Sequence, residues 1–187
     1  MKRFLTPVVA IGLLAGCASD PGARRESIVK EQSKQLPAPS TPLSSYERFE
    51  LKPIEMVDSV AKDQAKAAVA KDLEARLQAV VQPMLTRWNT AGGDRPAGTL
   101  IVQPRVTQLR VVHGATRAFA GAMAGDSSIT LELELRDAAT DAVIAKPSIA
   151  RNANAMAGAW SFGATDRNLL DYITNIASEY LERHHGR

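Results

Sequence analysis

Few residues of this 187-residue chain have the types and spacing that catalytic chemistry needs. Glu132 and Glu134 are separated by one leucine, and on a strand their side chains would lie ~7 Å apart on one face. That spacing suits paired-carboxylate chemistry. Because leucines fill the alternate positions, the pattern instead favours a strand with one apolar face and one solvated carboxylate face.

The three histidines stand in no catalytic or metal-binding motif. His113 ends a predicted strand, while His184 and His185 end the last predicted helix, where we expect a fraying, solvated terminus. The chain contains no G-x-S-x-G or H-E-x-x-H pattern. The glycine-rich segment 114–125 lacks the lysine of a phosphate-binding loop, and a strand rather than a helix is predicted to follow it. The sequence therefore predicts no catalytic residue, no metal site and no bound cofactor.

The single cysteine, Cys17, closes a distinctive N-terminal segment. Lys2 and Arg3 precede an apolar run over residues 4–14, which is shorter than the ~20 residues that span a bilayer but suits a secretory signal. The run ends in Leu-Ala-Gly-Cys at 14–17, which resembles the lipobox of bacterial lipoproteins. The resemblance implies cleavage before Cys17, a thioether-linked diacylglycerol on that residue and acylation of the new N-terminus. The alternative is an ordinary secreted protein with an incidental cysteine.

The position after the cysteine bears on the destination of such a lipoprotein. In Gram-negative lipoproteins an aspartate there is the inner-membrane retention signal, whereas this chain has Ala18. The resemblance therefore implies a lipid anchor in the outer membrane. Three acyl chains would hold the protein there, since each buried CH₂ contributes ~0.8 kcal/mol.

The charge balance argues against a nucleic-acid partner. The chain has 23 basic and 20 acidic residues, but two of the bases belong to the signal and four to the segment before residue 46. The remaining 17 bases face 17 acids, so the predicted domain is neutral. The single cysteine excludes an intramolecular disulfide, and the 45% hydrophobic content excludes wholesale disorder.

The sequence predicts three regions: a signal peptide over 1–16, a lipidated N-terminus with a flexible, proline-containing tether over 17–45, and a single domain over 46–187. Within the domain, strands are predicted at 46–54, 100–112, 129–136 and 143–151, and the aspartates and threonine of residues 137–142 predict a turn between the last two. A long helix is expected to begin at Asp58, to kink or lose its regularity at Pro83 and to close at Gly92-Gly93, and a second to begin at Thr165 or Asp166. This order, β-α-β-β-β-α, predicts an α+β fold with an antiparallel or mixed sheet of about four strands and two helices packed on one face.

Two segments rich in glycine and alanine, 114–127 and 152–165, flank the predicted hairpin of the last two strands. An antiparallel hairpin places the start of its first strand beside the end of its second, so both segments should lie at the same edge of the sheet. They carry the apolar side chains of Phe119, Met123, Met156, Trp160 and Phe162. These five either pack under the helices, where the small residues around them allow close contact, or form a docking patch for a partner protein or a membrane.

Residues 114–125, the hairpin at 133–145 and the segment 163–181 resemble an uncharacterised family of bacterial lipoproteins of unknown function. The hairpin turn of such families often reads Thr-Gly, where this chain has Thr140-Asp141. The layout is also similar to the small α+β domains of envelope lipoproteins of the CsgG and TolB N-terminal type. The resemblance brings no catalytic residues with it.

These observations together predict a lipid-anchored envelope lipoprotein that faces the periplasm and has a non-catalytic, protein-binding role. Its expected partners are the membrane and another envelope protein. Self-assembly into a homo-oligomeric envelope or secretion component is one alternative. A small-ligand-binding or hydrolytic domain with an unrecognised site is another.

Overall fold

The computed structural model describes residues 20–91, 98–111, 127–153 and 164–186. The helices of this part are α1 (Pro21–Gln35), the short 3-10 helix η1 (Leu43–Ser45), α2 (Asp58–Ala61), α3 (Gln64–Thr90) and α6 (Ala164–His185). The strands are β1 (Arg48–Leu51), β2 (Glu55–Met56), β3 (Thr99–Arg110), β4 (Ser127–Asp137), β5 (Val143–Ala145) and β6 (Ser148–Ala153). Among the described residues, no helix has the length and apolar character needed to cross a membrane.

The strands form one mixed sheet in which six segments fill four positions. β1 and β2 both pair in parallel with β3, β3 pairs antiparallel with β4, and β5 and β6 both pair antiparallel with β4. Each outer position is split where a proline stands, at Pro53 and at Pro147, because proline has no N–H for the ladder. The predicted α+β class and mixed sheet are therefore confirmed, with two more strands than expected.

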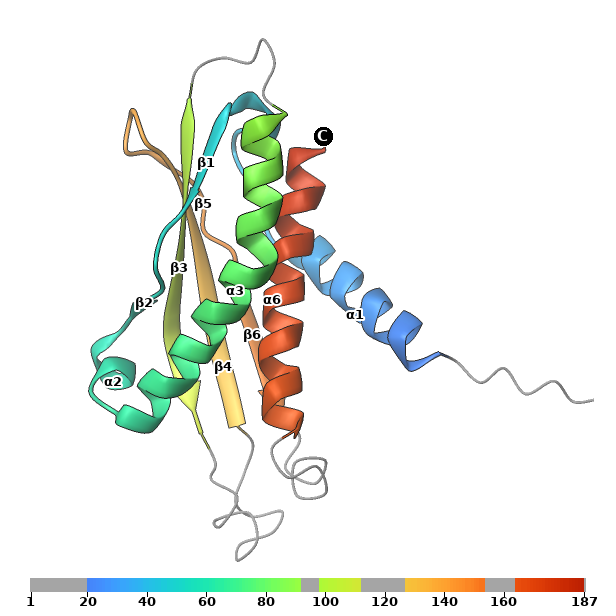
Figure 1. Ribbon diagram of the computed structural model, residues 1–187, viewed down its shortest axis with the longest axis vertical. Coiled ribbons are helices and arrows are strands. Elements are labelled where there is room, and N and C mark those ends of the chain that lie inside the picture. The colour runs from blue at the N-terminus through green and yellow to red at the C-terminus, as the bar shows by residue number, and fades with distance from the viewer. Residues whose placement is uncertain (1–19, 92–97, 112–126, 154–163, 187) are drawn as a thin grey trace, which may run out of the picture.

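Two helices cover one face of the sheet (Figure 1). α3 and α6 lie side by side and run in the same direction. Arg76 of α3 contacts Asp171 of α6, and farther along both helices Met84 Sδ lies 3.7 Å from Ser178 Oγ. The core lies between them and the sheet. It contains the inward residues of the two central strands and the facing residues of both helices, including Leu100, Val102, Val106, Ile129, Leu131, Leu133, Leu135, Leu73, Leu77, Val81, Met84, Ile173, Ile176 and Tyr180.

The long helix begins later than the sequence indicated, while its end, shortly before Gly92, agrees with the prediction. Asp58 starts the separate short helix α2, and α3 begins after Asp63, whose side chain accepts hydrogen bonds from the N–H groups of Ala65 and Lys66 at 3.0 and 3.2 Å. α3 passes through Pro83 and ends at Thr90. Pro83 lies on the exposed side of the helix, so the carbonyl group that it deprives of a partner can bind water.

The segment predicted to be a flexible tether is instead structured. Residues 21–35 form α1, which packs against α6, and Val29, Ser33 and Leu43 are buried. The carboxylate of Asp20 accepts a hydrogen bond from Gly22 N at 2.9 Å and caps the helix. The segment alone has too few apolar residues to fold, but α6 supplies the surface against which those few are buried.

The C-terminal histidines are also ordered, contrary to the predicted solvated terminus. His184 is buried and packs edge-on against Tyr180, with ring centroids 4.7 Å apart. His185 stacks on Trp88, with centroids 3.9 Å apart and ring planes within 2° of parallel. Because α6 runs parallel to α3, its last turn reaches the aromatic side chain near the end of α3.

The predicted turn between β4 and β5 is confirmed in atomic detail. One carboxylate oxygen of Asp137 accepts hydrogen bonds from the N–H groups of Ala139 and Thr140 and from the Thr140 hydroxyl, at 2.8–2.9 Å. Asp141 has a φ of 59°. This is the left-handed region that favours glycine.

Candidate functional site

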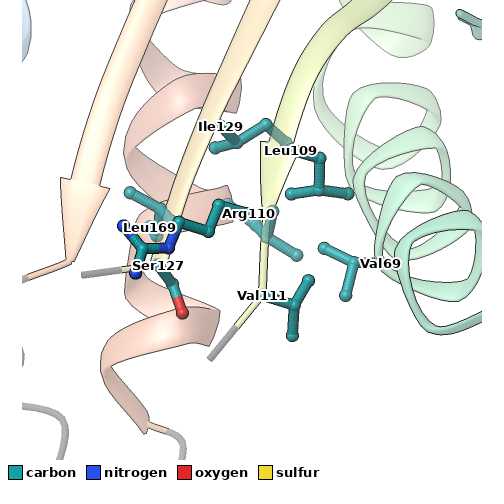
Figure 2. A pocket seen from close by; sticks show the side chains of 8 residues that line it. Val69, Leu109, Arg110, Val111, Ser127, Ile129 and Leu169 are labelled. Carbon is teal, nitrogen blue, oxygen red and sulfur yellow. The ribbon is translucent and has the colours of Figure 1, made fainter. Parts of the chain in front are cut away.

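An apolar pocket opens at one end of the sheet, between the sheet and the two helices (Figure 2). The pocket is small, with about 50 Å³ of space that water-sized groups can occupy. The lining comes from the end of β3 and the residue after it, the start of β4, and the first turns of α3 and α6: Val69, Leu109, Arg110, Val111, Ser127, Ile129, Leu169 and Leu170.

The sequence of α3 explains why the pocket lies at this end. The first turns of α3 contain Ala65, Ala67 and Ala70, which are partly or fully buried and whose short side chains fill less of the layer between helix and sheet. Farther along, large buried side chains such as those of Leu77 and Met84 fill the same layer. The pocket was not predicted from the sequence, although the run of alanines on an otherwise apolar stripe was the available signal.

The pocket is suited to binding rather than to proton transfer. Its polar lining consists of Ser127, which is 4% exposed, and Arg110, and both already take part in interactions. The other six lining residues are valine, leucine or isoleucine. An apolar group is therefore the chemical class that this surface would hold most favourably.

The sheet register brings together, at this same end, the strand residues that border the two predicted loop segments. Ser127, the first residue of β4, pairs with Ala153, the last residue of β6. The chain therefore leaves the described part of the sheet at adjacent points, as the hairpin argument predicted. The docking-patch residues themselves, Phe119, Met123, Met156, Trp160 and Phe162, lie outside the described residues, as do His113 and the predicted lipid-attachment residue Cys17.

The opposite face of the sheet carries a row of ion pairs rather than free carboxylates. Lys146 Nζ lies 3.1 Å from a Glu132 oxygen and 3.3 Å from a Glu134 oxygen. Arg136 bridges Glu134 and Asp141, the latter at 2.8 Å. On the neighbouring strands Arg105 lies 2.7 Å from Glu55. These charges neutralise one another across the strands.

Glu134 differs from the predicted solvated carboxylate. It is only 5% exposed, because the two cations lie over it. Hydrogen bonds from Arg136 and then Lys146 lower the pKa of the Glu134 carboxyl, although burial opposes this. A general acid needs the reverse change, a raised pKa. The geometry of Glu132 and Glu134 thus stabilises the sheet and does not prepare an acid–base pair.

A metal centre has no ligand set in the described part of the chain. No group of three or more His, Cys, Asp or Glu side chains converges there. The aromatic cluster of Phe49, Trp88 and His185 closes the far end of the helical layer through ring contacts.

Comparison with known proteins assigns the domain. The family model described as a domain of unknown function, DUF4410, matches residues 43–159, a range that contains all six strands and α3. The chain belongs to the DUF4410 family. This confirms the predicted membership in a family of unknown function. The match begins at Leu43, so α1 lies before it and α6 after it.

No curated protein matches the chain in sequence. Among solved structures, the chain is similar to a PelC dodecamer from Paraburkholderia phytofirmans and to a single-substitution variant of the same dodecamer. Both are 13% identical and cover 79% of this chain and 95% of their own, with TM-scores of 0.44 and 0.45 respectively.

Proposed function

We propose that this protein is a lipid-anchored lipoprotein of the outer membrane, facing the periplasm, and that its DUF4410 domain binds another envelope protein without catalysing a reaction. The anchor rests on the sequence up to Cys17: a basic start, a short apolar run and the Leu-Ala-Gly-Cys pattern. The binding role rests on one structural observation, the open apolar pocket at the end of the sheet.

Two features support protein binding at this pocket. Its lining is almost wholly apolar and is shared by four elements, as in the centre of a protein interface. The charged face of the sheet is a weaker candidate, because its carboxylates and cations already pair with each other. A partner side chain entering the pocket would bury apolar surface without desolvating an ion pair.

The anchor is tested by Cys17→Ser. The wild-type protein should fractionate with outer membranes and carry a mass increase on its N-terminal residue, whereas the variant should retain its signal peptide and lose the lipid. Wild-type protein that is found soluble, with an unmodified Cys17, would contradict the proposal.

The binding role is tested by photocrosslinking in cells. A photoreactive residue replacing Val111 at the pocket should capture a discrete partner, and one replacing Val143, which is 48% exposed on the β4–β5 hairpin, serves as the control. Adducts at both positions alike, or at neither, would refute the pocket as the docking site. An adduct between two copies of this chain would instead indicate self-assembly.

The predicted docking patch has its own test. In a Trp88→Phe background, Trp160 is the remaining tryptophan. If the patch docks a partner, the fluorescence emission of Trp160 should be red-shifted and quenched by solutes in the free protein. A blue-shifted emission that solutes do not quench would place Trp160 in the interior and remove it from the docking surface.

A second candidate function is binding of a small apolar ligand, and the almost wholly apolar lining of the pocket favours it. With about 50 Å³ of solvent-sized space, the pocket suits a short apolar group and is smaller than a typical ligand pocket. Co-purified small molecules, extracted with organic solvent and identified by mass spectrometry, distinguish this function from protein docking.

A further inference from the structure

The path from the predicted lipid anchor to the folded domain is short, because α1 is part of the domain. If residues 18–45 were a flexible coil, the domain would hang ~30 Å from the anchor. The described part of the chain begins at Asp20, which caps α1. Two residues, Ala18 and Ser19, therefore separate Cys17 from Asp20, and the three steps from residue 17 to residue 20 extend over at most ~11 Å.

Contacts along its whole length hold α1 and the residues after it on the domain. Near its start, the Arg25 guanidinium donates a hydrogen bond to Asn168 at 3.3 Å and lies over the Tyr172 ring. In its middle, Val29 is buried, and Arg183 donates a hydrogen bond to the carbonyl of Lys30 at 3.1 Å.

The stretch that follows α1 is fixed in the same way. The Tyr180 hydroxyl donates a hydrogen bond to the Pro37 carbonyl at 2.9 Å, and Ser40 N donates one to the Ile144 carbonyl, also at 2.9 Å. Leu43 is fully buried. No part of the described segment 20–45 is therefore free to act as a tether.

The start of α1 lies close to the pocket. Asn168, which Arg25 contacts, directly precedes Leu169 and Leu170 of the pocket lining. Arg25 lies five positions after Asp20 along the helix, a rise of ~8 Å. The Arg25 backbone therefore lies within ~20 Å of Cys17. The β4–β5 hairpin lies on the other side of the molecule from the start of α1 (Figure 1).

We propose that α1 is a docked strap that fixes the orientation of the domain on the membrane. Its exposed first turns, at Gly22, Ala23, Arg24 and Ser27, face the lipid headgroups. In this orientation the pocket opens close to the bilayer surface. This inference rests on the proposed lipid anchor. It identifies the bilayer as the partner of the α1 surface, and it restricts a protein bound at the pocket to one that presents its binding segment near the membrane.

The test uses the full lipidated protein in vesicles of phosphatidylethanolamine and phosphatidylglycerol that contain a headgroup-labelled nitroxide lipid. Ala23→Cys and Val143→Cys each supply one free thiol for a fluorophore, since the thiol of Cys17 is consumed by its lipid. The label at residue 23 is expected to lose most of its fluorescence, and the label at residue 143 little. Equal quenching at the two positions would overturn the inference.

Two further variants separate the strap from a flexible connection. Val29→Asp should undock α1 and reduce the quenching at residue 23, whereas Val143→Asp, the same change at an exposed position of the β4–β5 hairpin, should not. A long Gly/Ser insertion between Ser19 and Asp20 leaves α1 intact and should also reduce that quenching; an unchanged value would refute the strap. Protein that does not float with the vesicles refutes the lipid anchor itself, whereas floating protein with equal quenching refutes the orientation alone.

Discussion

Tyr180→Phe is a stringent test of how α6 holds the N-terminal segment, because it removes one oxygen from a fully buried side chain. The Tyr180 hydroxyl donates a hydrogen bond to the Pro37 carbonyl at 2.9 Å, while its ring packs against His184. The phenylalanine ring keeps the packing and loses the hydrogen bond. Pro37 lies at an exposed position, so water can replace the lost donor. We expect the unfolding free energy to fall by only ~0.5–1.5 kcal/mol at neutral pH.

The same substitution should reverse its effect in alkali. Burial raises the pKa of Tyr180 to about 12, from ~10 in an unfolded chain. Because the folded pKa is the higher one, the stability contributed by the neutral phenol is complete below ~pH 10 and is lost as the pH rises toward 12. A tenfold difference in proton affinity corresponds to ~1.4 kcal/mol. The unfolding free energy of the wild type should therefore fall by roughly that amount by ~pH 11 and by up to ~3 kcal/mol beyond ~pH 12. The variant has no phenol at this position and avoids the loss.

The assay is urea unfolding of both proteins at a series of pH values. Their difference in unfolding free energy cancels the other titrating groups, which both proteins share. We expect the wild type to be more stable at neutral pH, the two curves to cross near ~pH 11, and the variant to be more stable above that point. A difference that stays constant from neutral pH to ~pH 12 would refute the burial of Tyr180 and the docking of the Pro37 segment against it.

Three further predictions concern the turn, the ion pairs and the C-terminus. Asp141→Val should lower the unfolding free energy by ~1–2 kcal/mol, because a β-branched residue is strained at positive φ. Asp141→Gly should change the unfolding free energy by less than ~0.5 kcal/mol. Equal effects of the two substitutions in urea unfolding would contradict the turn geometry. The pKa of Glu134 is lowered, so its contribution is present above ~pH 4.3 and is lost as the pH falls through the lower folded value. The stability difference between wild type and Glu134→Gln should accordingly shrink in acid, and a pH-independent difference would count against the pairing with Arg136. His185→Ala should lower the thermal midpoint, because it removes ~0.5–1.5 kcal/mol of unfolding free energy, while His185→Phe should keep most of the stacking on Trp88. If neither substitution changes the thermal midpoint, the C-terminus is frayed.

Regular patterns along the chain predicted the sheet and its helices correctly. The alternation of Ile129, Leu131, Leu133 and Leu135 with polar residues identified β4, and these four side chains are buried. Apolar residues three or four apart identified α3 and α6. The turn at residues 137–142 was predicted from its aspartates and threonine. Such features depend on neighbours within a few residues, so a single sequence is enough to reveal them.

Features created by distant residues were missed or were predicted wrongly. Val29 and Leu43 looked too isolated to order residues 21–45, because the surface that buries them belongs to the folded domain and to α6 above all. Glu134 looked solvated, although Lys146, twelve positions later, and Arg136 cover it. The pocket was invisible for the same reason, since its lining joins residues from Val69 to Leu170.

The sequence by itself determined the α+β class, the order of the main elements, the neutrality of the domain and the pattern that predicts a lipid on Cys17, because each depends on residue type and local spacing. The tertiary structure alone decided that α1 is part of the domain, that the two glutamates are paired with cations, and that an apolar pocket opens where the first turns of α3 and α6 meet the end of β3 and the start of β4. Burial and ion pairing depend on surfaces brought together from distant parts of the chain, and only the fold brings them into contact.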